Sequence, residues 1–326
     1  MVVDVHFHQL PAAFLADVAA GRVAGVAEVA LADGRRALAF PGRAPVPLPP
    51  GIADLEGAIA HLDAVGHDRA LVTPWASALG DTLAAPEAVD YCRRLNAAMA
   101  EAVGASGGRL AALAVVPTTA PDEVAAVLAE ALGMGLRGAF LATHMADDPL
   151  DAPRLEAVWR AAEEMDAPVY LHPVNVVETR LERFNLANLL GNPMDTSIAA
   201  CALMFGGVLD RHPRLRVVLS HGGGTLPYGV GRLDQGYRAR RGGPLGSAHP
   251  PSDYLRRFYY DAVVYRAASL RFLVESVGAD RVMLGTDYPF DMEMPEPART
   301  VAEAVPEGPE REMVLAGTAR ALWRWP

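Results

Sequence analysis

The chain has 326 residues, 51% of them hydrophobic, and a formal net charge of −10 at pH 7. This length and apolar content suffice for one large core, so we expect a single domain over residues 1–326 that acts on a small molecule. The acidic balance argues against nucleic-acid binding, which requires clustered basic side chains. All 29 basic residues are Arg, which excludes Schiff-base chemistry, a P-loop lysine and a carbamylated lysine bridging two metals.

Eight short apolar or β-branched runs recur along the chain, separated by Ala- and Leu-rich stretches with helical spacing. Such repeated βα units predict an α/β fold in which eight parallel strands close a (β/α)8 TIM-type barrel. The predicted strands are VVDVHFH (2–8), ALVTPW (70–75), LAALAVVP (110–117), GAFLATH (138–144), PVYLHP (168–173), RVVLSHG (216–222), FYYDAVV (258–264) and RVMLGTDYPF (281–290).

The segments between these runs predict outer helices and two irregular insertions. Residues 122–135 and 152–166 have the apolar spacing of helices. Residues 20–53, rich in Gly, Pro and Arg, follow the first strand and are expected to form a small cap over the active face. Residues 175–197 follow the fifth strand and should form another wall of the pocket.

No targeting or membrane segment is expected. The first residues, MVVDVHFH, lack a basic region followed by an apolar stretch, and no run of about 18 apolar residues occurs. We therefore expect a cytoplasmic protein with no membrane partner. Cys92 and Cys201 are too few for a disulfide framework and are expected to be reduced, buried helix residues.

Ionisable residues gather at the predicted strand ends. His6 and His8 lie two residues apart on the first strand, so their side chains point to the same face. His172 ends the fifth strand, His221 the sixth and Asp287 the eighth. Barrel active sites are built at the carboxyl ends of the strands, whereas burying these groups without partners would be costly. The pattern favours one shared site over chance packing.

Three imidazoles and one carboxylate suit zinc or another first-row divalent ion. We therefore predict that His6, His8, His172 and Asp287 bind one divalent metal ion. An ion of this kind makes hydroxide available near neutral pH. His221, on the neighbouring strand, is then the candidate general acid/base.

The remaining histidines carry less information. His144 ends the fourth strand, and the sequence leaves open whether it lines the pocket or supports its other residues. The other four lie in a helix, turns or a loop and are expected to be solvated; they are His61, His67, His212 and His249. The GGG after His221 would let backbone approach a ligand closely. Arg232, a few residues further on, is either a carboxylate anchor or a surface residue.

Four motifs together resemble the amidohydrolase-2 branch of the amidohydrolase superfamily. They are DVHFH, YLHP, LSHGGGTLPYGVGR and LGTDYPF, and the likeness is densest over residues 168–290. Within that branch, the chain resembles the 2-amino-3-carboxymuconate 6-semialdehyde decarboxylases and related metal-dependent decarboxylases. The resemblance implies a mononuclear zinc site at His6, His8, His172 and Asp287, with His221 as the catalytic acid/base.

The resemblance further implies a homodimer. The Arg matching Arg232 would reach into the neighbouring pocket to hold a substrate carboxylate, and Phe290 would line the site. Two departures concern the substrate. The cap of the semialdehyde decarboxylases carries a Lys and an Arg that meet substrate, for which Arg36 is only a loose counterpart here, and a pocket Trp is replaced by Asn188.

The leading functional hypothesis is non-oxidative decarboxylation of a small unsaturated or aromatic carboxylic acid, with His221 and Asp287 as the catalytic residues. Hydrolysis or hydration of an amide, lactone or activated double bond could use the same site. A catalytically silent barrel would be expected to lose its ligand residues, whereas all five site residues are present.

Overall fold

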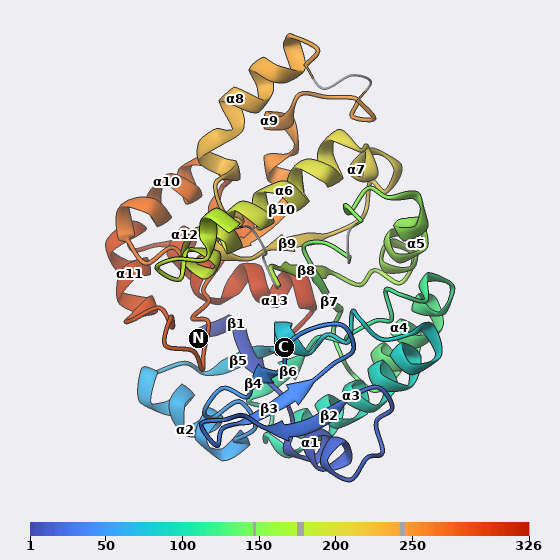
Figure 1. Ribbon diagram of the computed structural model, residues 1–326. Coiled ribbons are helices and arrows are strands. Elements are labelled where there is room, and N and C mark those ends of the chain that lie inside the picture. Colours follow the sequence, from blue (N-terminus) through green and yellow to red (C-terminus); the bar gives the residue numbers. More distant parts are fainter. Residues whose placement is uncertain (146–147, 175–178, 242–244, 326) are drawn as a thin grey trace.

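The computed structural model describes residues 1–325 apart from 146–147, 175–178 and 242–244. Within these residues, eight parallel strands form the centre of the molecule (Figure 1). Each coincides with one of the runs predicted from the sequence. The strands are β1 (Val3–Gln9), β5 (Arg69–Pro74), β6 (Leu110–Ala112), β7 (Ala139–Ala142), β8 (Val169–His172), β9 (Val217–Leu219), β10 (Phe258–Asp261) and β11 (Val282–Met283).

Hydrogen bonds close the strands into a ring. The strands pair in the orders β1-β5-β6 and β7-β8-β9-β10-β11. Ala114 joins the two groups, since its N–H donates to Gly138 O at 2.9 Å and its carbonyl accepts from Phe140 N at 2.8 Å. At the other seam Val5 N donates to Leu284 O at 2.9 Å. The predicted (β/α)8 barrel is confirmed.

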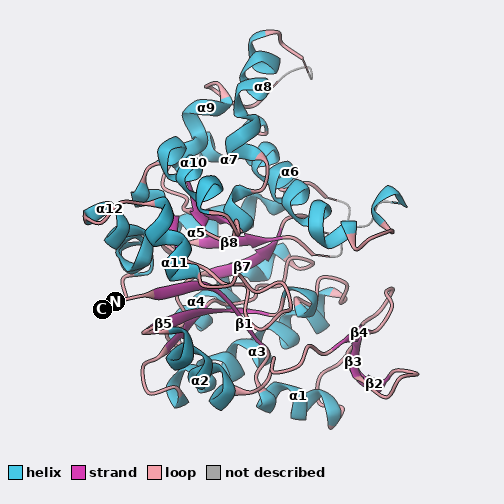
Figure 2. Cartoon of the chain, turned by 90° about the vertical axis from the view of Figure 1, so that its left-hand side faces the viewer, coloured by secondary structure: helices cyan, strands magenta, loops and turns pink. Residues whose placement is uncertain are grey.

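Helices surround this ring on the outside (Figure 2). Their bounds are α1 (Ala12–Ala19), α2 (Leu55–Val65), α3 (Ala85–Ala105), α4 (Val124–Gly133), α5 (Glu156–Glu164), α6 (Asn192–Phe205), α7 (Val208–Arg211), α8 (Leu226–Arg238), α9 (Pro251–Tyr254), α10 (Ala267–Val277), α11 (Pro297–Ala304), α12 (Pro309–Glu312) and α13 (Thr318–Trp323). The helices predicted at 122–135 and 152–166 are present as α4 and α5, each preceded by a 3₁₀ turn. No helix in the described ranges is both long and apolar enough to cross a membrane.

The insertion after the first strand has a sheet of its own. Strands β2 (Ala27–Ala30), β3 (Arg36–Ala39) and β4 (Val46–Pro47) pair antiparallel and lie apart from the barrel strands (Figure 2). Arg36 is exposed on β3 and its Nε donates to Glu28 Oε1 at 2.6 Å. That residues 20–53 act as a cap stays a prediction.

Four expectations about burial need correction. His67 and His212 are only 2% and 5% exposed, although both were expected to be solvated. His212 is buried because Glu156 and Glu163 pair with its two ring nitrogens. His61 is half-buried because it stacks on Tyr288, and Cys201 on α6 is half-buried rather than buried.

The remaining two expectations hold. Cys92 is buried on α3 and, like Cys201, is a free thiol. His249 is exposed in its loop, as expected.

Candidate metal centre

Four side chains meet at the carboxyl ends of the barrel strands. His6 and His8 come from β1, His172 ends β8, and Asp287 follows β11. One potential ligand atom from each lies within 4.8 Å of the others. All four residues are buried, and the exposed fraction of His6 and His8 is 0%. The structure therefore brings together the four residues that the strand pattern selected.

The closest approaches are between atoms that carry lone pairs. The Nε2 atoms of His6 and His8 are 3.1 Å apart. Asp287 Oδ1 lies 3.2 Å from the first of these nitrogens and 3.3 Å from the second. Such crowding of acceptors around one point is the arrangement of a cation site.

The opposite nitrogen of each ring has its own partner. His6 Nδ1 lies 2.7 Å from Asp261 Oδ2, His8 Nδ1 lies 3.2 Å from the Pro74 carbonyl, and His172 Nδ1 lies 2.8 Å from the Pro173 carbonyl. Carbonyl and carboxylate oxygens only accept, so each Nδ1 carries the proton and donates it. When each imidazole is neutral, all three Nε2 lone pairs are then left for a metal ion.

Two buried atoms of the cluster have no hydrogen-bond partner within the described part of the chain. They are His172 Nε2 and Asp287 Oδ1. Leaving such groups unsatisfied costs about 1–3 kcal/mol each, more when the group is charged. One divalent ion would satisfy both, and three imidazoles with one carboxylate form a donor set suited to it.

Electrostatics keep most of the donors free of protons. Burial lowers the pKa of His8 and, with help from the neighbouring imidazoles, holds the pKa of His172 well below its usual range. Burial alone would raise the pKa of Asp287, but the charge of His6 and the nearby imidazole of His221 hold it well below its usual range. His6 differs, because Asp287 and Asp261 raise its pKa despite burial. A metal ion entering the site has to displace a proton from His6.

His221 stands beside the cluster. It begins the turn after β9, and its Nε2 lies 3.8 Å from Asp287 Oδ2. Its ring centroid is 5.1 Å from that of His6 and 5.1 Å from that of His172. This position allows proton exchange with a group bound at the cluster.

A cavity of about 320 Å³ opens onto His221 and Asp287. Asn188, which lies in a π-helical turn, forms part of one wall, and Tyr265 forms part of another. The predicted wall is thus found in the later part of 175–197, since residues between 188 and 193 line the cavity. Residues 175–178 lie outside the described residues. Phe290 is half-buried, with its ring 5.1 Å from that of His8.

Two other candidates lie elsewhere. Arg232 is exposed on α8, which projects from the body of the molecule (Figure 1), and it does not line the 320 Å³ cavity of the described structure. His144 Nδ1 lies 3.0 Å from Asp195 Oδ2 on α6, and that carboxylate also accepts from the Thr143 hydroxyl. His144 therefore pairs with a carboxylate and is not one of the four clustered residues.

Sequence reasoning missed the groups behind the cluster. Asp261 and Asp4 are both fully buried carboxylates, and Tyr170 donates its hydroxyl to Asp261 at 2.7 Å. A signal was available for Asp261, because it ends β10 as His172 ends β8. Tyr265 could not have been found in this way, because it lies in the loop after β10 and not at the end of the strand. Its backbone there is left-handed, with φ 60°.

Comparison with known proteins agrees with this geometry. A family model described as amidohydrolase matches residues 3–325. The chain belongs to this amidohydrolase family. It is 32% identical over 242 residues to a 2-amino-3-carboxymuconate-6-semialdehyde decarboxylase of Dictyostelium discoideum, covering 72% of this chain and 66% of the relative. It is 29% identical to a gamma-resorcylate decarboxylase of Rhizobium sp., covering 63% of this chain and 67% of the relative.

Solved structures share the whole fold. The IDCase of Metarhizium anisopliae in apo form superposes with a TM-score of 0.86 at 26% identity, covering 100% of this chain and 97% of the other. A dihydroxybenzoic acid decarboxylase from Polaromonas sp., with bound manganese and the inhibitor 2-nitroresorcinol, has a TM-score of 0.79 at 21% identity. It covers 99% of this chain and 96% of the other, and at this identity it shows the fold alone.

Proposed function

We propose that this amidohydrolase is a metal-dependent carboxy-lyase that removes CO2 from a small unsaturated or aromatic carboxylic acid. The observation that carries this proposal is the convergence of three Nε2 lone pairs and the Asp287 carboxylate, with His221 beside them. The named relatives above, which decarboxylate conjugated or aromatic acids, support the same chemistry for this chain. A cytoplasmic location stays a prediction from the sequence.

The ligands in this proposal are His6, His8, His172 and Asp287, and the ion is one divalent cation. Zinc suits a donor set of three imidazoles and one carboxylate. The manganese in the Polaromonas structure makes that ion the first alternative. Metal analysis of protein purified without chelators distinguishes the two ions.

The ion would act as a Lewis acid toward a substrate oxygen. The C–CO2 bond then breaks, and the conjugated system of the substrate holds the electron pair left on carbon. In this proposal the imidazolium of His221 donates the proton that this carbon captures. Asp287, whose Oδ2 is 3.8 Å from His221 Nε2, keeps that imidazole aimed at the reacting carbon.

The substrate would lie in the cavity of about 320 Å³. Asn188 offers an amide that can pair with a hydroxyl or carbonyl of the substrate. Phe290 is not among the described residues that line this cavity, although its ring lies beside that of His8. No Arg is among the described residues that line this cavity. A substrate carboxylate that does not contact the metal therefore needs a cation from outside this cavity. A second copy of the chain could supply that cation through Arg232.

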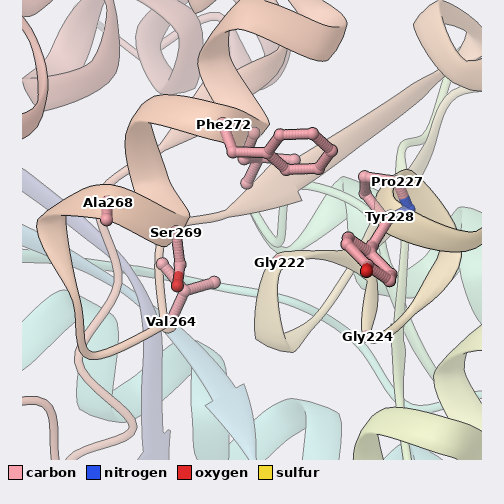
Figure 3. A pocket seen from close by; sticks show the side chains of 9 residues that line it. Gly222, Gly224, Pro227, Tyr228, Val264, Ala268, Ser269 and Phe272 are labelled. Atoms are coloured by element: carbon pink, nitrogen blue, oxygen red, sulfur yellow. The ribbon is translucent and has the colours of Figure 1, made fainter.

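A homodimer in which Arg232 reaches the partner's cavity is therefore part of the proposal. A second hollow of about 400 Å³ adjoins the first and shares Gly224, Val264 and Ser269 with it (Figure 3). Its rim carries Tyr228, which is 86% exposed, and Phe272, which is 43% exposed. Large aromatic side chains exposed around an apolar hollow are typical of a surface buried against a partner.

The proposal is tested by CO2 release. Metal-loaded protein is incubated with unsaturated and aromatic carboxylic acids, and His221→Ala should abolish release while retaining the metal. His249→Ala, which changes an exposed loop histidine, is the matched control. Release that persists in His221→Ala contradicts the role of His221. Products that gain solvent oxygen from labelled water, without CO2, would instead show hydrolysis or hydration.

A further inference from the structure

We infer that Asp261 is a positioning residue that holds two parts of the site at once, the metal ligand His6 and the general acid/base His221. The role of His221 rests on the proposed function, whereas the effect on His6 rests only on the metal site within that proposal and not on the reaction.

The contacts of Asp261 account for its whole carboxylate. It ends β10 with an exposed fraction of 0%. Its Oδ2 accepts from His6 Nδ1 at 2.7 Å, from the Tyr170 hydroxyl at 2.7 Å and from the backbone N–H of His221 at 3.0 Å. Its Oδ1 accepts from the N–H groups of Gly222 and Val263, both at 3.0 Å. An ionised carboxylate only accepts hydrogen bonds, whereas a protonated one must also donate. A carboxyl group surrounded by five donors is therefore suited to the charged form alone.

The bond to His6 decides which nitrogen faces the metal. With Nδ1–H donated to Asp261, the lone pair of Nε2 points at His8 and Asp287. A carboxylate in this place also makes the imidazole a stronger donor to a metal ion. Losing such an outer partner typically costs 10- to 100-fold in metal affinity.

The bonds to the turn after β9 decide where His221 stands. His221 has φ 53°, and Gly222, Gly223 and Gly224 follow with φ of 62°, 74° and 62°. A left-handed conformation is strained for a residue with a side chain. The N–H groups of the first two residues of this turn both end on Asp261, which offsets that strain. Only glycine fits at position 222 in this turn, because a Cβ there would lie 2.4 Å from Val264 Cγ1.

Asp4 provides a matched control. It is also fully buried, and it accepts from His6 N at 3.0 Å, Thr286 N at 3.1 Å and Thr286 Oγ1 at 2.6 Å. It holds the backbone of β1 but does not touch a ring nitrogen of the four clustered residues. A buried carboxylate that serves only the fold should therefore behave like Asp4.

The test compares Asp261→Asn with Asp4→Asn and Tyr170→Phe. Zinc affinity is measured by competition with a chromophoric chelator, which requires no substrate. We expect a 10- to 100-fold weaker affinity for Asp261→Asn and a change within about threefold for the other two. Affinity within threefold of wild type for Asp261→Asn, or an equal loss in Asp4→Asn, overturns the inference.

Two further measurements keep the inference open to refutation. If Asp261→Asn does not fold, the tautomer of His6 is measured in the wild-type protein instead, by nitrogen-15 spectra of a histidine-labelled, zinc-loaded sample. We expect the proton of His6 on Nδ1. A proton on Nε2 would overturn the inference. Where Asp261→Asn folds and a substrate is known, kcat at saturating zinc should fall at least tenfold with KM within about threefold. An unchanged kcat removes the link to His221, while absence of turnover in wild type refutes only the proposed function.

Discussion

Two clusters of ionisable side chains share β1 and the segment after β11, yet only one of them brings four potential ligand atoms within 4.8 Å of one another. The metal cluster consists of His6, His8, His172 and Asp287. The second, which we call the α2 cluster, consists of Asp4, His61, His67 and Glu293. Both contain histidines and carboxylates, and both are largely buried.

The difference lies in the partners of the imidazoles. Every histidine of the metal cluster has its Nδ1 bonded away from the site. In the α2 cluster, both ring nitrogens of His67 lack a hydrogen-bond partner among the described residues, and its Nδ1 is 3.6 Å from Asp4 Oδ2. His61 Nε2 lies 2.9 Å from Glu293 Oε1, but it too has no hydrogen-bond partner of suitable geometry among the described residues. Residue type alone does not make a metal site, because the second nitrogen of each ring must also be fixed.

The strongest test of the difference between the two clusters replaces one histidine in each of them with Ala. His172→Ala removes a ligand whose Nε2 has no other partner, so zinc affinity should fall more than about 100-fold, beyond the effect of losing an outer partner. His67→Ala should leave zinc affinity within about threefold. Competition with a chelator measures both, and the contrast fails if the two variants lose affinity equally.

Metal removal should destabilise the protein through the metal cluster alone. Free zinc at about 100 times its Kd adds about 2.7 kcal/mol to the free energy of unfolding, because only the folded chain holds the four ligands together. Denaturant unfolding with and without a chelator measures this increment. It should persist in His67→Ala and vanish in His172→Ala; an increment that survives in the second variant would place the ion elsewhere.

The α2 cluster should instead control the pH dependence of stability. Burial and the nearby charge of Asp4 raise the pKa of Glu293 to about 7. The folded chain then binds this proton more tightly than the unfolded chain, so stability from this group is present at low pH and is lost as pH rises from about 4.5 to about 7.

Glu293→Gln should remove this slope. The side chain is 26% exposed, so solvent screening limits the expected gain at pH 8 to about 1 kcal/mol. Urea unfolding at several pH values between 4 and 8 measures it. An unchanged slope would show that Glu293 titrates normally.

The smallest effect is expected at His8. Thr73 Oγ1 lies 2.9 Å from His8 Nδ1, but the Pro74 carbonyl remains an acceptor for the same proton at 3.2 Å. Thr73→Val should therefore weaken zinc binding by less than about threefold. A tenfold loss would mean that the hydroxyl, and not the carbonyl, fixes the His8 tautomer.

The sequence predicted the elements with the most regular patterns. The eight strands were found because each is a short buried run, and the four clustered residues were found because each lies near the carboxyl end of such a run. The pairing of His67 and Asp4 was not predictable, because it joins a turn after α2 to a strand 63 positions earlier in the chain. The role of Asp261 was missed since its partners come from two other strands, β1 and β8, and from the turn after β9.

The seam where the barrel closes lies within the metal cluster. Asp287 N donates to His6 O, and His8 N donates to Tyr288 O, both at 2.8 Å, so clustered residues from β1 and from the segment after β11 also join the first and last strands of the ring. An ion held there would link the first barrel strand to the segment that follows the last one. The ion would then add a second connection across a seam that backbone hydrogen bonds already close.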